Sequence, residues 1–474
     1  MKKNICVSIL FLALAAIVNA ASERVNFKKE PFFPIVGYNF LWCADEQMVK
    51  DQSDMGLTMI SVSTLDDFQW CEKYGLKGIY YNPAINRFLY DPNAPDLTET
   101  VQADVNKFLY HPAFYAVQIA DEPNRKAFEG YAKVMAAIKA LKPDIPVYTN
   151  LFPDYSQPYQ HGFEDYRQYA QSFSDLFKLY PVPIFCYDNY SNKNNLLKPS
   201  ERQAAFLGNL EVVREITLAE GIPFWVTVIA TAHDHHPDPN EADINFEVFS
   251  ALAYGAKGIG YFTTTSHISQ IFQGGPFDVF NEKTPLWRVI RDCNYRVRKL
   301  APYLLKIKST GAFYALNATD KNALGKFKLL PGRLVKSLQC DRGLSSFLVG
   351  EFTDANNEDY IMVVNLNLNA PARFTVVMVG SAVLEPINSY SGTPAASADS
   401  WLRAGKANSI KSLKKRSRKC ADAGFHAGGS LKFQMSRTWW CTKAMSNLVI
   451  ISGQAHGAAV MAIFTWLSKT LAEI

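Results

Sequence analysis

The sequence lacks the spaced cysteine pairs that bind zinc or build a disulfide scaffold. None of its 8 cysteines belongs to a C-x-x-C pair, and their spacing is irregular, so neither kind of domain is predicted. No G-x-G-x-x-G follows the first predicted strand, which argues against a dinucleotide-binding fold. We therefore expect no metal and no cofactor.

Beyond its N-terminus, the sequence also lacks an apolar run of about 20 residues, the length that spans a bilayer. The N-terminus has Lys2 and Lys3, then an apolar run over 5–18, with small residues at Val18 and Ala20. This pattern predicts a secretory signal peptide over 1–20, cleaved after Ala20. The mature protein is then periplasmic or extracellular, with no membrane insertion after cleavage.

Positive charge is scarce until the C-terminal tail. The formal net charge is +5, but residues 401–474 hold 12 Lys+Arg against 2 Asp+Glu, which leaves 37 against 42 before them, a net −5. The run KSLKKRSRK at 411–419 has the composition of a nucleic-acid or anionic-surface patch. In a secreted protein we favour a solvated charge run, so no nucleic-acid partner is expected.

Short β-branched or aromatic runs alternate with amphipathic segments of ten to twenty residues over about 33–306. Such alternation predicts parallel strands with crossover helices. The eight predicted strands cover 33–42, 57–64, 76–83, 114–122, 145–152, 183–190, 222–231 and 258–265. Eight βα units over this length are typical of a closed (β/α)8 TIM barrel.

The pattern changes after about 306 to short alternating strands with turn signals. It predicts a small antiparallel β-sandwich domain over 307–412, whose last strand covers 401–411. With 48% apolar content, two globular domains are expected: a barrel over 21–306 and this sandwich. The basic tail at 413–474 shows neither steady alternation nor clear turns, so no structure is predicted for it.

Acids, amides and aromatics stand at the predicted C-terminal ends of the barrel strands, where barrel enzymes place their active sites. Aromatic faces stack on sugar rings, and amides bond to sugar hydroxyls, so these residues favour a carbohydrate substrate. The alternative is that each aromatic only closes the barrel mouth. The candidate substrate-binding residues are Asn39, Trp42, Tyr81, Asn82, Asp121, Asn150, Tyr190 and Tyr261.

Two adjacent carboxylates and a proline end the fourth predicted strand, in the stretch QIADEPN at 118–124. A carboxylate held at a strand end is well placed for proton transfer. The alternative is helix capping, because Asp and Glu before the helical segment from Arg125 complement its dipole. These seven residues alone do not separate the two interpretations.

The stretch ADEPN resembles the acid/base motif of clan A glycoside hydrolases, the retaining barrel enzymes that include the β-galactosidase-like families. Those families typically have Asn-Glu-Pro, whereas this sequence has Asp121-Glu122-Pro123. The stretch 251–265 also looks like the approach to strand eight in those enzymes, where an aromatic floors the sugar site. The resemblance implies that Glu122 is the general acid/base and that Asp121 contacts the sugar.

The resemblance breaks at strand seven, where this clan places the nucleophile. No Asp or Glu occurs from Pro223 until Asp234. Three alternatives follow: Asp188 is the base of an inverting enzyme, at roughly 6.5–9.5 Å from Glu122; Asp234 folds back as nucleophile; or the barrel binds glycans without cutting them. Asp188 has its own structural alternative, as a cap of the following turn.

The stretch HDHHPDP at 233–239 concentrates imidazoles and carboxylates. These groups bind zinc, but metal sites need ligands that converge, and successive loop residues point apart. We interpret the stretch as a polar loop over the sugar site.

Overall fold

A computed structural model describes residues 32–38, 45–179, 184–191, 198–267, 272–380, 383–395 and 401–413. The predictions for the signal peptide, for Asn39 and Trp42, and for the tail after 413 lie outside these residues. The domain boundaries at 20, 306 and 412 therefore remain predictions.

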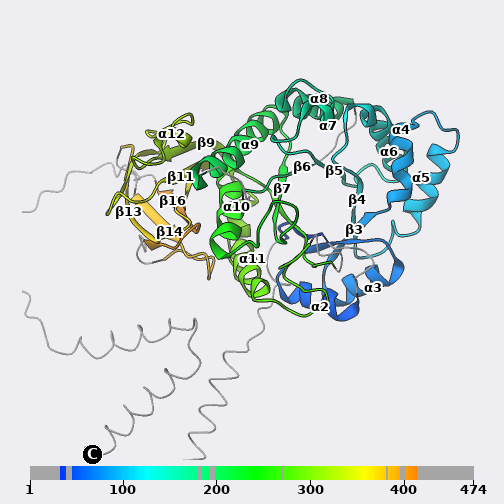
Figure 1. The fold of residues 1–474 in the computed structure, drawn as a ribbon, viewed down its shortest axis with the longest axis horizontal. Coiled ribbons are helices and arrows are strands. Elements are labelled where there is room, and N and C mark those ends of the chain that lie inside the picture. Colours follow the sequence, from blue (N-terminus) through cyan, green and yellow to red (C-terminus); the bar gives the residue numbers. More distant parts are fainter. Residues whose placement is uncertain are drawn as a thin grey trace, which may run out of the picture. The chain divides into compact units, whose positions relative to one another are not determined.

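Eight parallel strands close into a barrel in chain order, with helices around them (Figure 1). Each predicted strand contains one observed strand, which confirms the TIM barrel. The strands are β1 (Ile35–Gly37), β2 (Met59–Val62), β3 (Lys77–Tyr81), β4 (Phe114–Asp121), β5 (Val147–Leu151), β6 (Phe185–Asp188), β7 (Phe224–Ile229) and β8 (Gly258–Phe262). The helical segments between and after them are α2 (Glu46–Asp54), α3 (Leu65–Tyr74), η3 (Pro83–Asn86), α4 (Arg87–Tyr90), α5 (Leu97–Asn106), η4 (Arg125–Ala127), α6 (Phe128–Leu141), α7 (Pro158–His161), α8 (Tyr166–Leu179), α9 (Pro199–Glu220), α10 (Glu241–Tyr254) and α11 (Pro285–Leu304).

Local sequence explains where these helices begin and end. The α3 helix starts at a capping box in which Thr64 and Asp67 bond each other's backbone, and it ends at Gly75 in the left-handed conformation. Asn240 caps α10 in the same way, with Asp243 as the returning carboxylate. These caps fix how the chain passes from strand to helix.

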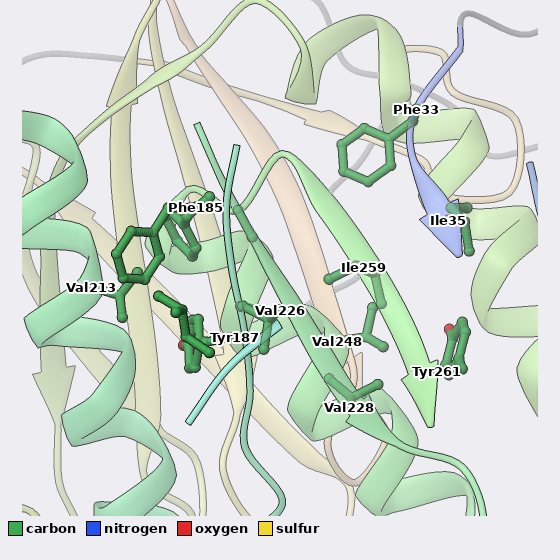
Figure 2. Close-up of a cluster of buried hydrophobic side chains, with 14 of the residues drawn as sticks. Phe33, Ile35, Phe185, Tyr187, Val213, Val226, Val228, Val248, Ile259 and Tyr261 are labelled. Carbon is green, nitrogen blue, oxygen red and sulfur yellow. The ribbon is translucent and has the colours of Figure 1, made fainter. Parts of the chain in front are cut away.

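Alternate strand residues fill two separate apolar layers. One layer fills the barrel interior with Val36, Met59, Ile79, Ala116, Tyr148, Ile184, Cys186 and Trp225. The other lies between the strands and the helices, where Figure 2 shows Val226, Ile259 and Tyr261 in one cluster with Val248 of α10. The interior is packed, so chemistry is confined to the ends of the strands.

Two antiparallel sheets follow the barrel. The first sheet has the order β10-β13-β15, and the second has the order β14-β16-β12-β11-β9. Apolar residues of both, including Val335, Phe347 and Phe374, share one core, as expected of a sandwich. The elements are β9 (Lys308–Ala315), α12 (Lys321–Leu324), β10 (Val335–Cys340), β11 (Phe347–Thr353), β12 (Asp359–Asn365), β13 (Ala372–Met378), β14 (Val383–Ile387), β15 (Trp401–Leu402) and β16 (Ala407–Leu413).

The single strand predicted over 401–411 is wrong, because the structure divides this stretch between the two sheets. A turn separates β15 from β16, with Gly405 at φ 66° and the Lys406 amide donating to the Arg403 carbonyl at 3.1 Å. A strand cannot continue through a left-handed residue, so the chain crosses from one sheet to the other at this point.

The sheets pack on the barrel through α9 and α10. The hydroxyls of Tyr254 and Tyr314 lie 2.7 Å apart, and the Arg214 guanidinium donates to the Ser309 hydroxyl at 2.8 Å. The four cysteines in the described part of the chain are free thiols. Within the same residues, no helix has the length and apolarity needed to span a bilayer.

Candidate active site

Glu122 directly follows the last residue of β4 and has a strained backbone. Its φ is 45°, a left-handed value that is uncommon for a residue with a side chain. Two long-range contacts hold this turn: the Glu122 amide donates to the Asn150 carbonyl at 2.8 Å, and the Tyr169 hydroxyl donates to the Pro123 carbonyl at 2.9 Å. Strain maintained by surrounding structure is typical of functional positions.

The helix-capping interpretation of this stretch does not fit the observed contacts. Asn124 is the residue that caps η4, where its side-chain oxygen accepts from the Lys126 amide at 3.0 Å. The α6 helix has no side-chain cap. Asp121 and Glu122 are therefore not used to cap the segment that follows them.

Asn150, at the end of β5, joins two of the carboxylates. Its amide nitrogen donates to Asp188 at 2.8 Å and to Asp121 at 3.2 Å. Its amide oxygen accepts from the Thr227 hydroxyl at 3.3 Å, which fixes the orientation of the amide. Asn150, predicted to bind substrate, thus positions the carboxylates of β4 and β6.

Glu122 and Asp188 lie close enough for the charge of Asp188 to act on the ionisation of Glu122. Burial and the charges of Asp188 and Asp121 raise the pKa of Glu122 from 4.5 to about 9. Burial and Asp121 raise the pKa of Asp188 to about 7, against hydrogen bonds from Asn150 and Tyr190 that lower it. Because the charge of one carboxyl disfavours ionisation of a neighbouring one, Glu122 is the member of the pair that keeps its proton to the higher pH.

Asp121 is the third carboxylate of the site and the most exposed of the three. It is exposed, yet enough protein surrounds it for burial to raise its pKa, against the Asn150 hydrogen bond that lowers it. Glu122 is half-buried and Asp188 is buried. Solvent therefore reaches the carboxylates from the side of Asp121.

The second carboxylate lies one strand away from the position that the family resemblance implies. In the barrel register Asp188 of β6 pairs with Thr227 of β7, and β7 itself carries no carboxylate. The inverting alternative required a separation of roughly 6.5–9.5 Å between the two carboxyl groups. The charge of Asp188 acts on Glu122, so Asp188 is the second carboxylate to which this condition applies.

Aromatic rings surround the pair, including two that the sequence interpretation missed. Tyr190 stacks on Phe262, with ring centroids 6.3 Å apart, and burial and the charge of Asp188 raise its pKa. Half-buried Phe262 was missed because its neighbour Tyr261 was chosen instead. Tyr155 was also missed; burial and the charges of Asp188 and Glu122 raise its pKa, which places it beside them.

The last two residues of β8, Tyr261 and Phe262, have different environments because side chains alternate along a strand. Tyr261 is fully buried, and its hydroxyl donates to Asn294 of α11 at 2.8 Å. Figure 2 shows it in the apolar cluster outside the barrel interior. The structure gives Tyr261 a packing role instead of the predicted substrate contact, and Phe262 faces the mouth, because successive residues point to opposite sides of a strand.

The two candidates after β3 have different environments. Asn82 uses both ends of its amide locally, since it donates to Asp104 at 2.9 Å and accepts from the Ala84 amide at 2.9 Å. This is the role of a cap rather than of a substrate ligand. Tyr81 lies at the site: it is half-buried, and burial, together with the charge of Asp121, raises its pKa.

Asp234 lies at the tip of a tight turn. The turn is closed by hydrogen bonds between the backbones of His233 and His236 at 3.1 and 2.8 Å, and Asp234 is exposed at φ 48°. The carboxylates that raise the pKa of Glu122 are Asp188 and Asp121. Asp234 is thus an exposed turn residue, and its role as nucleophile stays a prediction.

The histidines of this loop pack with the aromatic rings of the mouth. His233 contacts Tyr190 and Phe262 with ring centroids 5.4 Å apart in each case, and its Nδ1 lies 2.8 Å from the Thr231 carbonyl. Burial lowers the pKa of His233, so the ring is neutral near pH 7. In the described part of the chain, no three His, Cys, Asp or Glu side chains are arranged to hold a metal ion.

Glu247 of α10 is a buried carboxylate whose hydrogen bonds hold the segment after β6 and the end of β7. It accepts from the Ser191 amide at 2.6 Å, from the Ser191 hydroxyl at 2.8 Å and from the Ile229 amide at 3.0 Å. It thereby ties the segment after Asp188 to the end of β7. Sequence reasoning missed it because a glutamate within an amphipathic helix resembles a surface residue.

Comparisons with solved structures agree with this architecture, although no family model and no curated protein matches the sequence. A structure titled "Glycoside hydrolase" aligns over 81% of this chain and 93% of its own, at 10% identity and a TM-score of 0.50. The chain shares the closed (β/α)8 barrel fold with that structure. At this identity the likeness shows the fold alone.

Two further solved structures are similar at lower TM-scores. A glycoside hydrolase family 5 protein from Bacteroides vulgatus aligns over 81% of this chain and 89% of its own, at 9% identity and a TM-score of 0.49. A β-galactosidase from the psychrophilic Marinomonas ef1 aligns over 57% of this chain and 60% of its own, at 10% identity and a TM-score of 0.46. The chain thus spans less than two thirds of that β-galactosidase.

Proposed function

We propose that this protein is a glycoside hydrolase that acts on a glycan, with Glu122 as general acid/base. The observation that carries the proposal is the position of Glu122: its left-handed backbone follows the end of β4, and Asn150 holds the carboxylates of Asp121 and Asp188 beside it, where burial and their charges raise its pKa. A raised pKa is what a general acid needs to deliver a proton near neutral pH. The fold and the ADEPN motif support the same assignment.

Asp188 supplies the second carboxylate of the proposed reaction. A hydrogen bond from the Asn150 amide at 2.8 Å stabilises its charged form. The charge of Asp188 acts on Glu122, and we assign Asp188 the nucleophile's role of a retaining enzyme, which needs a carboxyl separation of roughly 5 Å. Asp188 then attacks the anomeric carbon while Glu122 protonates the departing oxygen. Water afterwards loses a proton to Glu122, attacks the same carbon and releases Asp188 as a free carboxylate. The anomeric configuration of the first product, read by NMR, tests this choice.

A non-catalytic glycan-binding barrel is the second candidate, because β7 has no carboxylate where the related clan has its nucleophile. The substitution Glu122→Gln separates the two. It keeps shape and one hydrogen bond but cannot donate the proton, so hydrolysis should fall by about 10²- to 10⁴-fold. Aryl glycosides with good leaving groups need little protonation and should lose less.

The control is Glu129→Gln, the same change on the exposed side of α6, where Glu129 pairs with Lys133 at 3.0 Å. Its activity should equal that of the wild type. If the wild-type protein releases no sugar from any aryl glycoside or oligosaccharide while still binding glycan, the hydrolase assignment is overturned and the binding barrel stands.

We propose further that the protein is secreted, with the first 20 residues removed. The support is the sequence pattern of two lysines, an apolar run and small residues at Val18 and Ala20. Intact mass measurement of the protein recovered from the periplasm or the medium tests it. A mature chain that retains these residues would contradict cleavage.

A further inference from the structure

Two tyrosines near the candidate site are unusually exposed for aromatic residues. Tyr159 of α7 is 86% exposed and Tyr90 of α4 is 60% exposed. Each belongs to a connection that leaves the C-terminal end of a strand, β5 for Tyr159 and β3 for Tyr90. Both rings therefore lie at the end of the barrel that carries the carboxylates.

The two short helices flank the turn that follows Glu122. The strand order places β3 and β5 on either side of β4. On one side α4 packs against η4 and α6, where Gly130 allows the Leu89 backbone to approach closely. On the other side Gly162, which ends α7, lies against the Arg125 side chain of η4. The helices carrying Tyr90 and Tyr159 are thus fixed to the segment that begins at Glu122.

Further aromatic residues continue from each tyrosine towards the carboxylates. Tyr155 stands four residues before Tyr159. Burial and the charges of Asp188 and Glu122 raise its pKa. On the opposite side, Tyr81 is the last residue of β3. Burial and the charge of Asp121 raise its pKa. In the strand order, Tyr90 and Tyr81 belong to the β3 side of Glu122, and Tyr155 and Tyr159 belong to its β5 side.

We propose that Tyr90 and Tyr159 are outer stacking sites for a polymeric glycan that passes over Glu122 and continues on both sides of it. The inference rests on the proposed function and names its substrate class: a polysaccharide or long oligosaccharide bound at an internal linkage. A short glycoside covers only the carboxylates and their nearest rings, and needs neither tyrosine. Exposed rings on rigid helices offer flat apolar faces to sugars at little entropic cost.

Tyr110 provides a matched control on the same domain. It is 80% exposed but lies between α5 and the start of β4, at the opposite end of the barrel. If exposure of an aromatic ring alone caused glycan binding, Tyr110 would contribute as much as Tyr159. The proposal assigns binding only to the rings at the end with the carboxylates.

The test uses the full-length protein carrying Glu122→Gln, so that binding is measured without hydrolysis. Affinity gel electrophoresis with galactan, galactomannan, xylan and mixed-linkage β-glucan compares Tyr90→Ala, Tyr159→Ala and Tyr110→Ala in that background. We expect at least one polymer to retard the Tyr110→Ala protein fully. Each of the other two should weaken that binding by about 5- to 10-fold, and Tyr159→Phe, which keeps the ring, should restore it.

Two results overturn the proposal: equal retardation of all three alanine variants, or no retardation by any of these polymers. In either case, hydrolysis of aryl glycosides by the protein with Glu122 intact shows that the polymer inference alone has failed. Absence of that hydrolysis as well shows that the proposed function has failed with it. Because all three tyrosines are exposed, unfolding temperatures of the variants should match and exclude misfolding as the cause.

Discussion

Replacing Glu122 by Gln should stabilise the protein at pH 8 and have little effect at pH 5. Burial and the charges of Asp188 and Asp121 raise the pKa of Glu122 from 4.5 to about 9. Between these values the folded protein keeps a proton that the unfolded chain has released. The unfolding free energy of the wild type therefore falls as pH rises through this window, and Gln, which does not ionise, removes that loss.

The size of the effect follows from the width of the window. Each pH unit corresponds to about 1.4 kcal/mol, so the interval from 4.5 to 8 gives an upper bound of about 5 kcal/mol. Interaction with Asp188 and access of water to half-buried Glu122 both reduce this difference. We expect Glu122→Gln to raise the unfolding free energy at pH 8 by about 1–2 kcal/mol. The left-handed backbone at this position affects Glu and Gln alike, so it cancels.

Thermal unfolding at pH 5 and pH 8 measures the difference for the wild type and for Glu122→Gln. Glu129→Gln is the control; its carboxylate is exposed and paired only with Lys133, so its effect should stay within about 0.5 kcal/mol at both pH values. A Glu122→Gln protein that is less stable than the wild type at pH 8 would refute the reasoning. So would an equal difference between the two proteins at both pH values.

Three more predictions concern groups outside the carboxylate pair. Glu247→Gln should lower the unfolding free energy by about 1–3 kcal/mol, because a single amide oxygen cannot accept from all three donors that Ser191 and Ile229 supply; an unchanged unfolding temperature would contradict it. Tyr261→Phe should cost about 1 kcal/mol by removing the bond to Asn294 while leaving kcat/KM unchanged, and a raised KM would mean that Tyr261 contacts substrate after all. Truncation after Leu413 should preserve cooperative unfolding. Truncation that also removes β16, which pairs with both β12 and β14, should abolish folding of the sheets. Loss of the cooperative transition in the protein truncated after Leu413 would show that the tail is needed.

Secondary structure and strand order were predictable because they follow from short-range patterns. A strand such as 224–229 is an apolar run bounded by Pro223 and a polar loop, and a helix such as α3 carries its own start and stop signals. Eight such units in sequence leave few ways to close a sheet. For the same reason Glu122 could be placed at a strand end before any contact was known.

The composition of the site required the tertiary structure, since it depends on contacts between residues far apart in sequence. Asn150 joins Asp121 and Asp188 only because β4, β5 and β6 are neighbours in a defined register. A shift of one residue along a strand exchanges its two faces, which is why Phe262 rather than Tyr261 reaches the mouth. The sequence by itself determined which elements form and which residues end the strands. Closure of the barrel decided which of those side chains converge, and the burial that closure produces shifted the pKa of Glu122.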